Sequence, residues 1–144
     1  MAITADALNR LLQSRLPAGL QIPPPCFTEM RAEPLDYADG SLLSLRFPVQ
    51  ARYQNPLGYM QGGFIVAAID NTIGPFSYLV APPSVTARLG VDYLRPVLPA
   101  MTHIDCIARL VQRTRRSLYL SAEVLGPDGK VIALCQATQQ LLDR

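Results

Sequence analysis

The second half of the chain alternates apolar and polar residues with a period of two, a pattern that predicts β-strands with one buried face. Four such runs cover residues 85–93, 104–110, 118–124 and 131–137. The sequence Gly-Pro-Asp-Gly at 126–129 favours a tight hairpin turn, because Pro127 is preset for the first corner and Gly129 tolerates positive φ. We therefore expect four long antiparallel strands.

In the first 20 residues, by contrast, the apolar residues recur at helical spacing. Thr4 is a suitable N-cap for a helix whose leucines lie at positions 8, 11, 12 and 16, and Pro17 ends it. The segment 1–20 is thus expected to form an amphipathic helix that flanks the domain. Two further strands are expected at 27–33 and 41–49, on either side of the turn-rich residues 36–40.

A helix that starts at Gly62 would be apolar on every side over residues 64–69, and such a helix is normally buried. Gly74 and Pro75 either kink this helix or end it, and Pro82 with Pro83 closes the segment. One buried helix with two strands before it and four after it predicts an α+β fold, a curved antiparallel sheet around a central helix. The 144 residues fit a single domain, 1–144.

Composition narrows the function classes. A net charge of +2 and a pI of 8.6 are too mild to indicate a nucleic-acid partner. No apolar run approaches the roughly 18 residues of a membrane span, so we expect no membrane partner. Three widely spaced cysteines, an odd number, indicate reduced thiols and a cytoplasmic location. The single histidine, His103, excludes a two-histidine metal site such as HExxH.

The common nucleophile motifs are absent: the sequence contains no GxSxG elbow, no Walker loop and no GxGxxG after a strand. A Cys–His pair would require His103 to reach a cysteine. Cys106 and Cys135 lie in the apolar phase of their predicted strands, which favours buried thiols.

One stretch combines features that suit acyl transfer, the loop from Asn55 to Gly63 and the helix that follows it. Gly62 and Gly63 let backbone N–H groups approach a ligand at a helix N-terminus, where unpaired donors and the helix dipole favour negative charge. That is the chemistry of an oxyanion hole. Asp70 is a carboxylate among apolar neighbours, which is costly to bury unpaired. Alternatively, the glycines only begin a tightly packed helix and Asp70 faces solvent.

These residues resemble a motif of the hotdog-fold thioesterase superfamily, in its branch of small phenylacetate-pathway-type acyl-CoA thioesterases. The family pattern is Asn, six residues later His-Gly-Gly, and an Asp nine residues after the His. This chain has Asn55, then Gln61, Gly62 and Gly63, then Asp70. The segment 84–96 resembles the family strand that carries Ser or Thr at its third position, and the similarity runs over about residues 41–138.

The resemblance implies an acyl-CoA thioesterase without a metal or organic cofactor. Asp70 would be the general base or nucleophile, and the Gly62 N–H would stabilise the oxyanion. Asn55 would orient the site, and Gly63 would help to bind the substrate. Thr86 would hold the attacking water or the carboxylate. Gln61 stands where the family commonly has His; it still donates and accepts hydrogen bonds but takes no proton near neutral pH.

Three arginines, Arg113, Arg115 and Arg116, crowd the end of one predicted strand, where they would meet the phosphates of CoA or simply form a solvated turn. Two rival functions stay open. A hotdog hydratase would pair its Asp with a His five residues on, where this chain has Pro75. The second rival is a hotdog module that binds acyl-CoA without catalysis. Gln61 supports it, because glutamine takes no proton near neutral pH.

Helix geometry predicts the assembly. Gly62 and Asp70 are eight residues apart, or about 12 Å along one helix axis, whereas one thioester carbonyl must lie within about 3 Å of both groups. Two antiparallel helices across a two-fold axis solve this. The family dimers join edge to edge and often pair again into tetramers. We expect a homodimer or homotetramer in which Asn55, Gln61 and Gly62 of one chain face Asp70 and Thr86 of the other.

Overall fold

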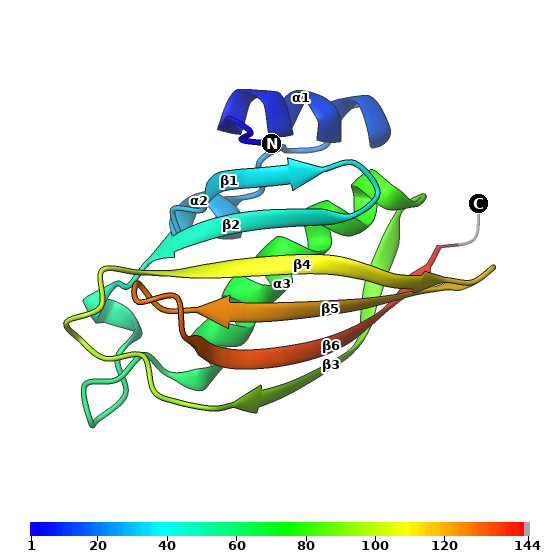
Figure 1. The fold of residues 1–144 in the computed structure, drawn as a ribbon. Helices are drawn as coiled ribbons and strands as arrows, with labels where there is room; N and C mark the ends of the chain where they lie inside the picture. The colour runs from blue at the N-terminus through cyan, green and yellow to red at the C-terminus, as the bar shows by residue number, and fades with distance from the viewer. Residues whose placement is uncertain (143–144) are drawn as a thin grey trace.

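A six-stranded antiparallel sheet curves around one long helix in the computed structural model, which describes residues 1–142 (Figure 1). The order across the sheet is β1-β2-β4-β5-β6-β3. The strands are β1 (Glu33–Ala38), β2 (Leu42–Pro48), β3 (Ser84–Tyr93), β4 (His103–Arg113), β5 (Ser117–Leu125) and β6 (Val131–Leu141). The α+β architecture of a curved sheet around a central helix, predicted from the alternation pattern, is confirmed.

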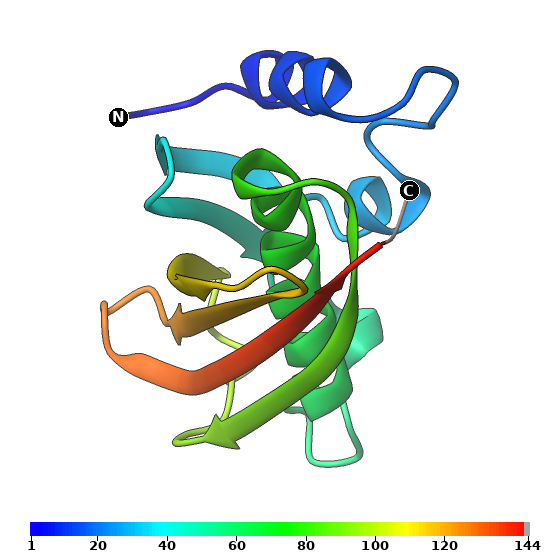
Figure 2. The ribbon, with the colours of Figure 1, turned by 90° about the vertical axis from the view of Figure 1, so that its right-hand side faces the viewer.

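The helix α3 (Gly62–Val80) lies in the concave side of the sheet (Figure 2). Its buried positions recur at helical spacing: Ile65, Ala68, Ile69, Thr72, Ile73, Phe76, Ser77 and Leu79. The opposite stripe, with Val66, Asp70 and Gly74, is only half-buried, so the expectation of burial on every side holds for one face alone. The length and hydropathy of α3 would also suit a membrane span, but its apolar face forms the core under the sheet.

Pro75 does not end α3, which continues for five more residues to Val80. Proline removes one backbone donor, so the carbonyl of Asn71 loses its usual helical partner. Close to the proline, the Ser77 hydroxyl donates to the Gly74 carbonyl at 2.6 Å. The surrounding core outweighs the cost of the proline, because α3 is packed against the sheet on both sides of it.

The N-terminal third agrees with the prediction at its ends and differs in the middle. α1 (Ala5–Arg15) begins as expected, with the Thr4 hydroxyl accepting a bond from the Ala7 amide at 3.2 Å. The strand expected at 27–33 is wrong: this region forms the short helix α2 (Pro25–Glu29). Pro25 suits a first helical position, and Phe27 and Met30, three residues apart, are both buried.

The strand β1 then begins later than expected and extends through most of the segment 36–40, which the sequence predicted to be a turn. The turn is confined to residues 39–41, where Gly40 has φ +70° and the Ser41 amide donates to the Ala38 carbonyl. β2 matches the predicted strand at 41–49, and a 3-10 turn, η1 (Ala51–Tyr53), follows it.

Replacing Ile69 by Ala should destabilise the protein by about 2–5 kcal/mol, because its side chain is fully buried between α3 and the sheet and leaves a cavity. Urea unfolding followed by circular dichroism measures the loss. The matched control is Ile107→Ala on the half-buried outer side of β4, where the same truncation should cost much less. Equal losses at both positions would contradict the packing described here.

Candidate active site

Asp70 lies in the middle of α3 and is held by a threonine of the neighbouring edge strand. The Thr86 hydroxyl donates to Asp70 Oδ1 at 3.0 Å. A β-bulge brings Thr86 into this position, because the pairing with β6 skips Ala87 between Thr86 and Arg88. Before the bulge the even positions of β3 face the helix, and after it the odd positions do. The uniform alternation predicted for residues 85–93 is therefore wrong at its start, and Val85 is half-exposed.

A buried glutamine, which the sequence analysis did not identify, fixes the direction of this bond. Gln139 Nε2 donates to Thr86 Oγ1 at 3.0 Å, and the Gln139 side chain is 1% exposed. A hydroxyl has one proton, so Thr86 accepts from the amide and gives its own proton to Asp70. The signal in the sequence is a polar residue that continues the inward phase of β6 after Cys135 and Ala137.

The N-terminus of α3 presents two free backbone donors. The Gln61 carbonyl accepts from the amides of Phe64, at 2.9 Å, and Ile65, at 3.3 Å. Within residues 1–142, the amides of Gly62 and Gly63 have no hydrogen-bond acceptor. Both are first-turn donors at the positive end of the helix dipole. The Gln61 side chain is exposed and makes no capping bond, so it remains available at the same place.

Asn55 builds the loop in front of these amides. Its side-chain Oδ1 accepts from the amides of Leu57, at 2.9 Å, and Tyr59, at 3.1 Å. Gly58, with φ +83°, allows the tight turn. The loop is tied to the start of α3 because the Gln61 amide donates to the Tyr53 carbonyl at 2.8 Å. With Oδ1 engaged in the loop, Nδ2 is the group that Asn55 has left for a ligand.

The predicted site residues thus form two groups on one helix. Asp70 and Thr86 lie together, and Asn55, Gln61, Gly62 and Gly63 lie together at the helix N-terminus. Since α3 is continuous, eight residues and about 12 Å of helix separate the two groups within one chain. One chain does not bring them to a common point.

The three arginines predicted to bind CoA, Arg113, Arg115 and Arg116, are exposed around the turn between β4 and β5. Arg113 Nη1 donates to the carbonyl of Val80 at 3.4 Å, which places this turn by the C-terminus of α3. The backbone of Arg116 is held by β6, because its carbonyl accepts from the Leu141 amide at 2.8 Å.

Arg115 and Arg116 therefore do not lie beside the glycine amides of their own chain. Gly62 begins α3 and Val80 ends it, so the length of the helix separates the arginine turn from the helix N-terminus. One chain therefore cannot offer both its oxyanion donors and these arginines to the same CoA ester. Contact with CoA at the glycine end would require the arginines of another chain.

The described residues also show where metal-ligating side chains and two of the cysteines lie. In residues 1–142, no three His, Cys, Asp or Glu side chains gather as a metal site would require. Cys106 and Cys135 are buried, as predicted, and burial raises the pKa of the Cys106 thiol to about 12. A thiol with so high a pKa stays protonated at neutral pH, and the thiolate is the nucleophilic form.

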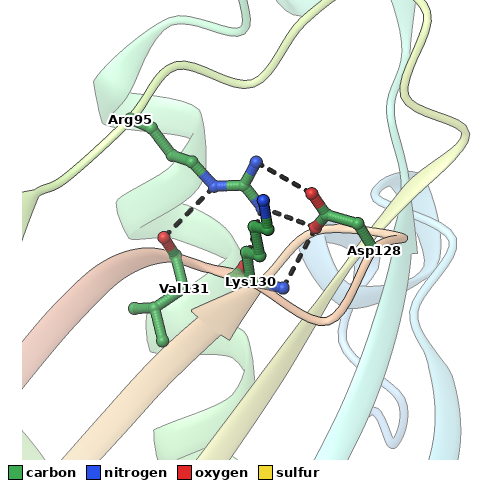
Figure 3. Close-up of polar contacts among 4 residues, drawn as sticks. All are labelled: Arg95, Asp128, Lys130 and Val131. Atoms are coloured by element: carbon green, nitrogen blue, oxygen red, sulfur yellow. Dashed lines mark hydrogen bonds and ion pairs between the residues drawn. The ribbon is translucent and has the colours of Figure 1, made fainter.

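An ion pair fixes the chain where it leaves β3 (Figure 3). Arg95 donates to both carboxylate oxygens of Asp128, at 2.6 and 3.1 Å, in the hairpin between β5 and β6. Its other donors reach the carbonyls of Lys130, at 2.9 Å, and Val131, at 3.3 Å. The loop after Arg95 also meets the Asn55 loop region, because the Met60 amide donates to the Val97 carbonyl. Arg95 therefore braces the loops around the helix N-terminus.

Known proteins share both the sequence pattern and the fold. The model of the thioesterase superfamily matches residues 57–133, more than half of the chain. The conserved protein PA5202 from Pseudomonas aeruginosa is 31% identical, with a TM-score of 0.76 over 88% of this chain and 100% of its own.

Two further solved structures are similar. A mutant of the phenylacetic acid degradation protein PaaI from Thermus thermophilus is 26% identical, with a TM-score of 0.76 over 83% of this chain and 100% of its own. The protein smu.793 from Streptococcus mutans UA159, bound to acetyl CoA, has the same fold at 16% identity. Its TM-score is 0.74, and the match covers 89% of this chain and 97% of its own. No curated protein matches the chain significantly.

Replacing Asp128 by Asn should weaken folding at neutral pH and have little effect in acid. Hydrogen bonds from Arg95 and from the Lys130 amide lower the pKa of Asp128 below its ordinary value of 3.8. A lowered pKa contributes stability above the unfolded-state value, and this is lost as the pH falls through the folded-state value. Urea unfolding at pH 7 and below pH 4 should show the difference shrinking. In an Arg95→Ala background, Asp128→Asn should have a clearly smaller effect at pH 7, because only the Lys130 amide still bonds the carboxylate; a full effect there would contradict the pairing.

Proposed function

The chain belongs to the thioesterase superfamily and has its hotdog fold, and we propose that it hydrolyses an acyl-CoA to a carboxylic acid and free CoA. The observation that carries the proposal is that α3 bears both a carboxylate held by a threonine, in its middle, and two free amides at its N-terminus. A carboxylate and preorganised N–H donors are the groups that thioester hydrolysis needs.

Asp70 initiates the attack on the thioester carbon, either by taking a proton from a water molecule or by adding to the carbon itself. The Thr86 hydroxyl orients the carboxylate, and Gln139 orients Thr86. As the carbonyl oxygen becomes negative, the amides of Gly62 and Gly63 donate to it. The carbon–sulfur bond then breaks and CoA leaves as a thiolate that takes up a proton. If water attacked, the acid is formed directly; if Asp70 attacked, water hydrolyses the resulting acyl-aspartate anhydride, which releases the acid and restores the carboxylate.

A dimer completes the site in this proposal. β3 is the last strand of the sheet, and residues 85–88 on it are exposed, so a second β3 has an open edge to join. The half-buried stripe of α3 carries Asp70 on the same side of the molecule. Antiparallel helices across a two-fold axis would place the Gly62 end of one chain beside Asp70 of the other. Two equivalent sites follow, each built by both chains.

The exposed side chains of Arg113, Arg115 and Arg116 are proposed to meet the phosphates of CoA, since guanidinium groups form paired hydrogen bonds to phosphate oxygens. Because they lie far from Gly62 of their own chain, they would serve a site whose glycine end comes from another chain. The acetyl CoA bound to smu.793, a protein of the same fold, supports a CoA ester as the ligand.

The second candidate function is a module that binds acyl-CoA without hydrolysing it. Gln61 favours it, because an exposed glutamine at the helix N-cap provides hydrogen bonds but no proton transfer. Steady-state release of free thiol from a small panel of acyl-CoAs separates the two functions. Turnover on any member supports the thioesterase, and saturable binding without thiol release supports the module.

Replacing Asp70 by Asn should lower kcat for acyl-CoA about 10²-fold or more while the protein stays folded, because the amide cannot act as a base or a nucleophile. Thiol release with a chromogenic thiol reagent measures the rate. The matched control is Asp92→Asn on the exposed outer side of β3, which should keep the wild-type rate. Near-normal turnover of the Asp70 variant would show that this carboxylate is structural.

Subunit mixing tests the shared site. Asn55→Asp keeps an oxygen for the Leu57 and Tyr59 amides but removes the Nδ2 donor, so it should inactivate one half-site without unfolding the loop. Unfolded and refolded together with Asp70→Asn chains, it should regain about a quarter of wild-type activity, because half of the dimers are mixed and one site in each is intact. Each variant refolded alone is the control. No recovery in mixed dimers, verified by native mass spectrometry, would place the site within one chain.

A further inference from the structure

A tyrosine at the end of β3 is bonded to the first residue of α3. The Tyr93 hydroxyl donates to the Gly62 carbonyl at 2.8 Å. The ring lies against the glycine itself: a Cβ on Gly62 would come within 3.0 Å of the phenol oxygen and 3.1 Å of Cζ. A side chain at residue 62 would therefore require the phenol to shift by a few tenths of an ångström.

The position of Tyr93 is fixed independently of α3. The bulge at Ala87 turns the odd positions of β3 toward the helix, and Tyr93 is the last of them. It pairs with Ala133 of β6, and the next amide, that of Leu94, donates to the Ile132 carbonyl at 2.7 Å. Two residues after Tyr93, Arg95 is clamped onto the β5–β6 hairpin (Figure 3). The backbone that carries the phenol is therefore held by the sheet.

The phenol hydroxyl acts on the peptide unit that carries an oxyanion donor. The Gly62 carbonyl and the Gly63 N–H belong to one planar peptide group, so holding the carbonyl also holds the direction of the N–H. Two successive glycines at a helix N-terminus have unusual backbone freedom and are prone to fray without such a bond. A donor on the carbonyl also polarises the peptide and strengthens its N–H as a donor.

We propose that Tyr93 is a positioning residue for the oxyanion hole, in which its hydroxyl fixes the Gly62–Gly63 peptide so that the Gly63 N–H points at the thioester oxygen. The inference rests on the proposed thioesterase function and extends it to a residue outside the Asn, Gly-Gly and Asp motif. Burial, with a smaller effect of Cys135, raises the pKa of Tyr93, so the phenol remains a donor at neutral pH.

The test is Tyr93→Phe, which removes the hydroxyl and keeps the ring. We expect kcat to fall about tenfold, the rate equivalent of one lost hydrogen bond, with KM unchanged within about twofold, since the bond acts on the developing charge. Tyr119→Phe is the matched control, because Tyr119 is about as exposed as Tyr93 but lies on the outer side of β5, away from α3. A wild-type kcat in Tyr93→Phe, or a loss seen equally in Tyr119→Phe, would overturn the inference and leave the proposed function standing.

A second measurement needs no turnover. In protein labelled with ¹⁵N-glycine, the nine glycine amides give separate signals, and Gly63→Ala identifies one of them. The Gly63 signal should shift or broaden in Tyr93→Phe and stay in place in Tyr119→Phe. If the wild-type protein hydrolyses no acyl-CoA, the proposed function fails, and these signals alone decide on Tyr93. An unmoved Gly63 signal would overturn the positioning role in either case.

Discussion

The single extra residue in β3, Ala87, changes the phase of the strand and thereby connects the sheet to the helix at two places. Ahead of the bulge Thr86 reaches Asp70, and beyond it Tyr93 reaches Gly62. A strand of strict period two would present Thr86 and Tyr93 to opposite faces of the sheet. Both groups of the candidate site are therefore held by one strand, and the distance between them is set by the pleat of β3 and the rise of α3.

The two faces of α3 have different roles. Its apolar face fills the concave side of the sheet with fully buried side chains such as Ile69 and Ile73, and a helix anchored in this way does not tilt easily. The other face bears Asp70, where a carboxylate can be half-buried because Thr86 donates to it. The half-buried stripe of an otherwise apolar helix is therefore the surface on which a charged group, a substrate or a second helix can be accommodated.

Much of this fold follows from the sequence alone, since β4, β5, β6 and α3 are long and strongly patterned. The errors lie where short-range signals compete. Pro25 begins a helical turn instead of a strand, and the polar residues of 36–40 pair in β1. In the site, the motif residues are local and could be identified from their spacing. Gln139 and Tyr93 act through partners 53 and 31 residues away. The phase of β6 indicates that Gln139 points inward, but not that it meets Thr86, and the bulge in β3 decides where Thr86 and Tyr93 point.

Electrostatic attraction, and not geometry alone, would favour the proposed dimer. With antiparallel helices, the positive N-terminal end of each α3 lies beside the other chain's Asp70, and that attraction is favourable before any substrate arrives. Before substrate binds, the amides of Gly62 and Gly63 would face this carboxylate or a water molecule beside it. When the thioester is bound, they would donate instead to its carbonyl oxygen as that oxygen becomes negative. Because Gln61 adds no charge at the helix N-terminus, the helix end of one chain and Asp70 of the other are the groups that set the electrostatics at the thioester carbonyl. The same donors would thus favour assembly and catalysis.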